Sequence, residues 1–163
     1  MKKVLIISTS LRKDSNSEYL AKEFERGAKA AGNETELITL AHKKIGFCIG
    51  CLACQRTQQC VIRDDTIEIA DKVKNADVVV FATPIYYYEM CGQMKTLLDR
   101  MNPLFSSDYH FRDIYLLTTA AEAEESAMDG AMKGMQGWID CFPKARLSGV
   151  LRGVGISDAG EAK

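Results

Sequence analysis

Four of the six cysteines in this sequence lie in one short segment, at Cys48, Cys51, Cys54 and Cys60. Their C-x2-C-x2-C-x5-C spacing lets three thiolates surround one corner of a cubane iron-sulfur cluster while the fourth completes the ligand set. Structural zinc more often uses two separated C-x2-4-C pairs, which this spacing does not resemble. The spacing therefore predicts ligands of a 4Fe-4S cluster, and the alternative that these are metal-free loop cysteines stays open.

The other nucleophiles and bases form no recognisable catalytic arrangement. The sequence has only two histidines, His42 and His110, and neither lies in a nucleophile context. We expect both on the surface. Cys91 and Cys141 fall in or near predicted helices and are expected to be buried thiols. No catalytic residue is predicted.

A hydroxyl-rich segment follows the first apolar run, where residues 8–17 read STSLRKDSNS. It leads into a predicted helix, whose N-terminal N–H groups and partial positive charge favour a phosphate. Neither G-x-G-x-x-G nor G-x-x-x-x-G-K-S/T occurs, so the extra donors are side chains. Such a loop suits a terminal monophosphate, like that of flavin mononucleotide (FMN). The candidate phosphate ligands are Ser8, Ser10, Arg12, Ser15, Asn16 and Ser17.

A simpler interpretation of the same loop remains open. Ser15, Asn16 and Ser17 are good helix-capping residues, and Arg12 is then a solvated charge.

Three consecutive tyrosines follow the most apolar run of the chain. Their flat faces and hydroxyls can border an aromatic ring, and a glycine nearby lets the backbone approach it. The alternative is that the tyrosines only cover the edge of a sheet. The candidate ring contacts are Pro84, Ile85, Tyr86, Tyr87, Tyr88 and Gly92.

Short apolar runs alternate with amphipathic segments, as in a parallel sheet covered by helices on both faces. The predicted strands are residues 4–7, 35–40, 78–82, 114–118 and 147–151. A capping box at Asp65 to Glu68 predicts a helix running to about Asn75. Residues 41–63 lose periodicity and are predicted to be a long cysteine-bearing loop. The remaining helices are marked by inward-facing residues at Leu20, Phe24, Ala28 and Ala31, at Met94, Leu98 and Met101, and at Met128, Met132, Met135 and Ile139.

Length and composition set the limits of this interpretation. The 163 residues fit one domain, with 47% hydrophobic and 26% charged residues. A net charge of -1 argues against nucleic acid as a partner. No secretory signal or membrane span is recognised, which predicts a cytoplasmic protein with reduced cysteines. We therefore expect one five-stranded, doubly wound α/β domain over residues 1–163, with its ligand at the carboxyl ends of the strands.

These motifs resemble the NADPH-dependent FMN reductase and iron-sulfur flavoprotein group of the flavodoxin-like superfamily. The resemblance covers about residues 1–120. It is carried by Ser10-x-Arg12-x-x-Ser15-Asn16-Ser17, by Pro84-Ile85-Tyr86-Tyr87 through Gly92, and by Lys95 and Asp99-Arg100.

The resemblance implies that the hydroxyl loop holds the FMN phosphate and that Pro84 to Tyr87 lie along the flavin ring. It also implies a third flavin-edging loop at residues 118–121, with contacts from Thr119 and Ala120, although the glycines often found there are absent. A homodimer or homotetramer is implied as well. Met90, Phe105 and Tyr109 are candidate exposed residues for such an interface.

Three functions remain open. The first is an NAD(P)H-dependent FMN oxidoreductase that reduces a quinone, flavin or similar small acceptor. The second is an iron-sulfur flavoprotein, with FMN and a 4Fe-4S cluster, that exchanges electrons with a ferredoxin-like partner. The third is a non-enzymatic, flavodoxin-type electron carrier.

Overall fold

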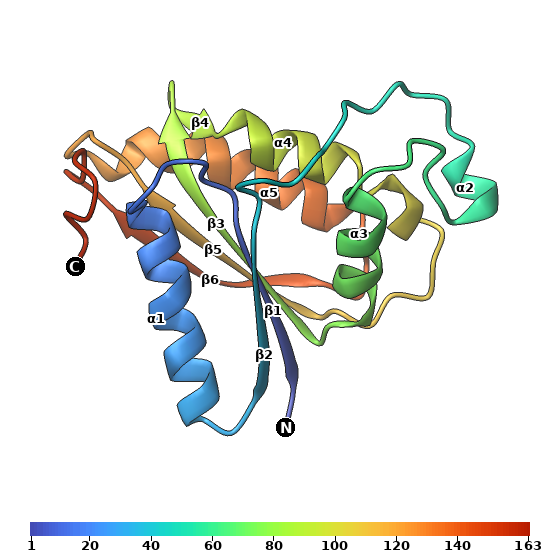
Figure 1. The fold of residues 1–163 in the computed structure, drawn as a ribbon, viewed down its shortest axis with the longest axis horizontal. Helices are drawn as coiled ribbons and strands as arrows, with labels where there is room; N and C mark the ends of the chain where they lie inside the picture. The colour runs from blue at the N-terminus through green and yellow to red at the C-terminus, as the bar shows by residue number, and fades with distance from the viewer.

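Five parallel strands form the centre of the computed structural model, which describes residues 1–163. Their spatial order is β2-β1-β3-β5-β6, and a short β4 pairs antiparallel with the end of β3 (Figure 1). The order confirms the predicted doubly wound sheet. The strands are β1 (Lys3–Ser8), β2 (Glu34–Thr39), β3 (Val78–Tyr86), β4 (Glu89–Met90), β5 (Asp113–Thr119) and β6 (Arg146–Gly153).

The central position of β3 follows from its composition. Residues 78–82 read VVVFA and are all buried, so both faces of the strand are covered. In register with Phe81 lie Ile7 of β1 and Leu116 of β5. The most apolar segment of the sequence therefore lies in the middle of the sheet, as predicted.

Helices cover both faces of the sheet. One face packs against α1 (Asn16–Ala30), and the opposite face packs against α3 (Thr66–Asn75), α4 (Gly92–Asp99) and α5 (Asp129–Asp140). The remaining helical segments are short: α2 (Cys54–Thr57), η1 (Asn102–Leu104) and η2 (Glu125–Met128). None of the helices has both the length and the apolar character that a membrane span requires.

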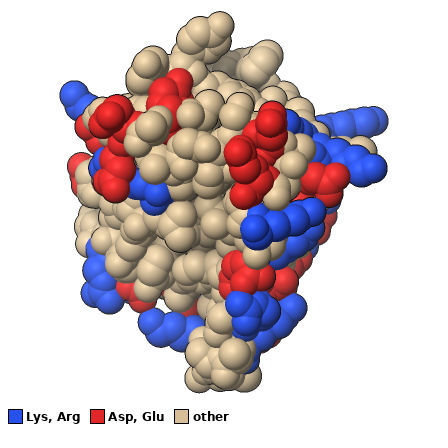
Figure 2. Space-filling view, turned by 90° about the vertical axis from the view of Figure 1, so that its left-hand side faces the viewer, with Lys and Arg blue, Asp and Glu red and all other residues tan.

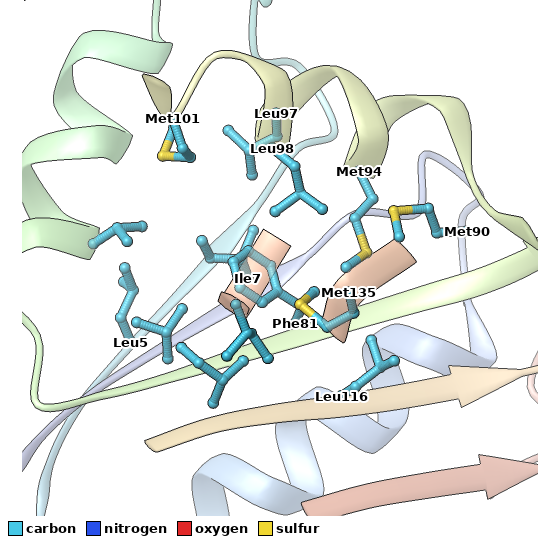
Figure 3. Packing of buried hydrophobic residues seen from close by; sticks show 14 of the residues in the cluster. Leu5, Ile7, Phe81, Met90, Met94, Leu97, Leu98, Met101, Leu116 and Met135 are labelled. Atoms are coloured by element: carbon cyan, nitrogen blue, oxygen red, sulfur yellow. The ribbon is translucent and has the colours of Figure 1, made fainter. Parts of the chain in front are cut away.

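The larger part of the core lies under α3, α4 and α5. Figure 3 shows Met94 and Leu98 of α4 above Ile7 and Phe81 of the sheet. The unbranched methionine side chains fill the irregular space between helices and strands. A smaller cluster joins the other face to α1 through Leu20, Phe24 and Ala28, as their spacing predicts.

Three predicted element boundaries are wrong in detail. β3 continues through Thr83 to Tyr86, beyond the predicted strand at residues 78–82, because these residues pair with β5 and β4. The predicted capping box at Asp65 does not form. Instead, Asp64 accepts hydrogen bonds from the backbone N–H and the hydroxyl of Thr66. α1 ends before Ala31, which is exposed.

Several burial predictions also differ from the structure. Met90 and Tyr109 are buried rather than exposed, because Met90 lies on β4 against α5 and Tyr109 stacks on Phe111. Phe105 is exposed, as expected. Cys141 is exposed rather than buried, since α5 ends just before it.

Candidate functional site

The hydroxyl loop lies at the carboxyl end of β1 and leads directly into α1. Ser15 is the N-cap of this helix, and its Oγ accepts a hydrogen bond from the Glu18 N–H at 3.4 Å. The hydroxyls of Ser15 and Ser17 lie 3.0 Å apart, and both residues are buried with Ser10. The structure therefore brings two of the predicted phosphate ligands, Ser15 and Ser17, together beside the free N–H groups of a helix N-terminus.

One hydroxyl in this region lacks a partner. Ser8 ends β1, is fully buried, and its Oγ makes no hydrogen bond. A buried hydroxyl without a partner is costly unless another group completes its hydrogen bonding. The orphaned hydroxyl, the buried serines and the helix N-terminus together fit an anionic group such as the FMN phosphate.

The two longer candidate ligands have different partners. Arg12 Nη1 donates to the carbonyl of Ser157 at 2.7 Å, and Asn16 Nδ2 donates to the carbonyl of Asp158 at 2.8 Å. Asn16 Oδ1 also accepts from the Ala162 N–H at 3.1 Å. The side chains of Arg12 and Asn16 are thus hydrogen-bonded to a C-terminal segment, residues 156–163.

The tyrosine segment forms a hairpin tip rather than a flat wall. Ile85 belongs to the hydrophobic core, so its side chain points away from a ring at the sheet edge. Tyr87 is 101% exposed, and Tyr86 and Tyr88 are also exposed. Tyr87 and Tyr88 have φ of 51° and 64°, a left-handed conformation that costs non-glycine residues energy. Such strain is concentrated at functional loops, and here it projects aromatic rings outward from the sheet.

A buried hydrogen-bond network that the sequence analysis missed joins the two loops. Thr9 Oγ1 donates to the carbonyl of Ala82 at 2.9 Å and contacts Cys91 Sγ at 3.2 Å. The Cys91 N–H donates to Thr83 Oγ1 at 3.1 Å. The only sequence signal for this network is that Thr9 and Thr83 lie at the carboxyl ends of adjacent strands. The network fixes the hydroxyl loop relative to the start of α4.

The third predicted loop contributes little side-chain surface. Thr119 and Ala120 are buried, and the Ala120 N–H donates to the carbonyl of Gly153 at 2.8 Å. Gly92, by contrast, lies at the start of α4 with open space in front of its Cα.

Two hollows meet around Leu11 at this edge of the molecule. One, of about 650 Å³, borders the hydroxyl loop and includes Arg12, Ser15 and His42. The other, of about 390 Å³, lies between the loop tip, Phe47 and Gly92. Both are in the size range of small-molecule sites. The left-hand side of Figure 1, seen face-on in Figure 2, has a broad uncharged area bordered by acidic and basic groups.

The cysteine loop is anchored at both ends by one buried ion pair. Arg100 donates through Nη1 to Asp64 Oδ2 at 2.7 Å and through Nη2 to Asp64 Oδ1 at 3.0 Å. The same two nitrogens donate to the carbonyls of Gly46 and Ile62, on either side of the cysteines. Burial alone would raise the pKa of Asp64, but hydrogen bonds from Arg100 and Thr66 outweigh it and hold that pKa well below its usual range.

The four cysteines of the loop divide into two pairs. Cys48 and Cys51 are exposed on a segment without regular structure. Cys54 is buried at the first residue of α2, and Cys60, which follows the end of α2, is half-buried. The loop thus contains a short helix, whereas we had expected it to lack regular structure throughout. No three His, Cys, Asp or Glu side chains converge where one metal ion could bind. Four soft thiol donors nevertheless suit a multi-iron cluster, which occupies more space than one ion.

The sheet order, with a loop after β1 that leads into a helix N-terminus, defines a flavodoxin-like, doubly wound fold. The chain belongs to the NADPH-dependent FMN reductase family, whose model matches residues 2–141. The predicted family and its FMN cofactor are thereby confirmed.

Curated relatives and solved structures agree with this assignment. An iron-sulfur flavoprotein of Methanocaldococcus jannaschii is 40% identical over 102 residues, which are 63% of this chain and 53% of the relative. One from Archaeoglobus fulgidus is 38% identical over 103 residues, 63% of this chain and 46% of the relative. The chain thus spans about half the length of the curated relatives it matches.

The solved structures show the fold. An NAD(P)H:quinone oxidoreductase from Methanothermobacter marburgensis superimposes with a TM-score of 0.72 at 16% identity, over 96% of this chain and 85% of the other. An azoreductase from Bacillus anthracis gives a TM-score of 0.73 at 16% identity, over 95% and 88% of the two chains.

Proposed function

We propose that residues 1–163 form one FMN-binding domain that acts as an NAD(P)H-dependent oxidoreductase on a quinone, a flavin or a similar small acceptor. The observation that carries this proposal is the set of buried hydroxyls before the N-terminus of α1, with the orphaned Ser8 hydroxyl, on a loop that borders an open hollow. Membership of the NADPH-dependent FMN reductase family supports it.

The residues of the chain bind and orient the cofactor in this proposal. Ser8, Ser10, Ser15 and Ser17 donate hydrogen bonds to the phosphate, and the N-terminus of α1 adds N–H groups and a favourable dipole. The hairpin tip with Tyr86 to Tyr88 borders the ring, and the space at Gly92 admits it. When bound, FMN supplies the electron-accepting chemistry, which is why the site needs no catalytic acid or base.

A binding experiment tests the phosphate site. Titrating the protein with FMN should quench flavin fluorescence, and Ser10→Ala or Ser17→Ala should weaken binding about 10- to 100-fold, since a hydrogen bond to a charged group contributes about 1.5–3 kcal/mol. Ser126→Ala, an exposed serine on η2, serves as the control and should bind like the wild type. Failure of the wild-type protein to take up FMN would overturn the proposal.

The reductase function differs from that of a pure electron carrier in its response to a nicotinamide. Mixing FMN-loaded protein with NADPH or NADH without oxygen should bleach the flavin absorption band rapidly, and a quinone should restore it. A loaded protein that neither nicotinamide reduces would instead be an electron carrier.

A second function is favoured by the cysteine spacing and by the names of the curated relatives, which are iron-sulfur flavoproteins. In this function Cys48, Cys51, Cys54 and Cys60 hold a 4Fe-4S cluster, which exchanges electrons with a ferredoxin-like partner. Iron and acid-labile sulfide measured on anaerobically purified protein distinguish the two functions. Absence of both would exclude the second.

The assembly and location belong to the same proposal. We expect a homodimer or homotetramer in the cytoplasm, without a nucleic-acid partner. The near-neutral net charge of -1 is consistent with that last expectation.

A further inference from the structure

The turn between α4 and η1 directs a hydrogen-bond donor at a sulfur of the cysteine loop. Asn102 Nδ2 lies 3.0 Å from Cys54 Sγ and donates to it. A neutral thiol is a weak acceptor, whereas a thiolate accepts N–H donors strongly. The hydrogen bond from the amide to this buried sulfur is therefore strongest when the sulfur carries negative charge.

A second donor, two residues earlier, lies beside the other anchored cysteine. The Arg100 side chain is 0% exposed, and its terminal nitrogens are occupied by Asp64, Gly46 and Ile62. Its Nε is buried without any partner. Arg100 and Cys60 line the same cavity, of about 400 Å³, under the cysteine loop. A buried guanidinium with one unused N–H thus lines the same cavity as Cys60.

The two halves of the cysteine loop differ in how many contacts hold them to the rest of the fold. Cys54 is the first residue of α2, which packs on η1, and Cys60 follows the end of this helix. Ser106 Oγ also donates to the carbonyl of Gln55 at 3.0 Å and fixes this half of the loop. Cys48 and Cys51 are exposed and have no such anchors.

We infer that Asn102 and Arg100 are positioning residues for a metal-sulfur centre: Asn102 donates an N–H hydrogen bond to the sulfur of Cys54, and Arg100 donates one to the sulfur of Cys60. Cys48 and Cys51 complete the ligand set from the exposed half. Hydrogen bonds to ligand sulfurs stabilise the more negative, reduced centre and raise its reduction potential. This inference rests on the second proposed function.

The test uses the full chain, reconstituted anaerobically with FMN, iron and sulfide. Asn102→Ala removes the donor, and Asn102→Asp removes it in a side chain of the same shape. Both should shift the midpoint potential of the cluster to more negative values in a spectroelectrochemical titration, and the aspartate should shift it further because of its charge. Ser106→Ala removes the hydrogen bond to the Gln55 carbonyl in the same half of the loop but removes no hydrogen bond to a sulfur. It should leave the potential unchanged.

Iron, sulfide and FMN contents measured on the same samples separate the outcomes. Selective loss of iron in Asn102→Asp with FMN retained also supports the inference, because the ligand pair is then no longer held. Unchanged cluster potentials in both Asn102 variants overturn it. A wild-type protein that binds FMN but no iron overturns it as well and leaves the FMN oxidoreductase function intact. A cluster without FMN instead overturns that function.

Discussion

At the scale of single residues, Arg100 and Asp64 connect three segments that are distant in the sequence. The pair is bidentate, and Arg100 also holds Gly46 and Ile62. Asp64→Ala leaves a buried guanidinium without its counter-charge, which typically costs about 3–5 kcal/mol. We expect a corresponding drop in the free energy of unfolding, measured by urea denaturation. Asp65→Ala, at a neighbouring carboxylate that does not contact Arg100, should cost much less.

The same pair predicts how stability depends on pH. Because the pKa of Asp64 is lowered in the folded state, its contribution is fully present above the ordinary aspartate pKa of about 4 and is lost as the pH falls below it. The stability difference between the wild type and Asp64→Asn should therefore be large at neutral pH and shrink toward pH 3. Parallel stability curves over that range would contradict the assignment.

At this scale only local signals could be interpreted from the sequence. The hydroxyl loop is a run of neighbouring residues after a strand, and its Ser15 and Ser17 lie at the N-terminus of α1. Their role in binding phosphate stays a prediction. Contacts such as Arg100 with Asp64, or Thr9 with Cys91, join residues far apart in the chain. No spacing rule in one sequence pairs them, because the pairing is set by how the helices pack on the sheet.

At the scale of elements, the β3–β4 hairpin depends on a close contact with α5. A Cβ at Gly130 would lie 2.4 Å from the carbonyl oxygen of Tyr88, too close for any side chain. Gly130→Ala should therefore displace the hairpin that carries the three tyrosines. We expect weaker FMN binding, by fluorescence titration, together with a lower melting temperature.

Gly137 provides the control on the same helix. Nothing lies within 4 Å of a Cβ there, so Gly137→Ala should stabilise α5 by up to about 1 kcal/mol and leave FMN binding unchanged. If Gly130→Ala behaves in the same way, the hairpin is not held by this contact.

The C-terminal segment allows a further prediction about the hydroxyl loop. The carbonyls of Ser157 and Asp158 accept hydrogen bonds from Arg12 and Asn16. Ending the chain after Gly155 releases both donors, and we expect FMN to bind up to about 30-fold more tightly, since each hydrogen bond is worth about 1 kcal/mol. Adding Arg12→Ala to the shortened chain should remove about half of this gain in binding free energy. Weaker binding by the shortened chain would mean that the segment belongs to the site.

Element interiors were predictable, and their ends were not. The apolar run at 78–82 identified the central strand, but its continuation to Tyr86 depends on pairing with β4 and β5. The capping carboxylate of α3 is Asp64 rather than Asp65, because Asp64 is held by Arg100 from another element. Contacts with other elements thus decide where a strand or helix ends when the local sequence is compatible with two positions.

At the scale of the whole molecule, alternation of apolar runs and amphipathic segments was sufficient to predict the doubly wound sheet. A parallel strand needs a crossover helix, and short connections allow few topologies. The exposed residues were harder to predict, since Met90 and Tyr109 look like surface residues but are buried. Their burial depends on α5 and on the Phe111 region, which no local pattern reveals.

The distribution of exposed apolar side chains leads to a prediction about assembly. Tyr87 on the hairpin tip and Phe47 at the start of the cysteine loop are both highly exposed, as are several neighbours in these two segments. Contiguous exposed apolar surface commonly marks an interface between subunits. We therefore expect light scattering to give at least twice the mass of one chain, and the double variant Phe47→Ser, Tyr87→Ser to shift the protein toward the monomer. A monomeric wild type would refute the predicted homodimer or homotetramer.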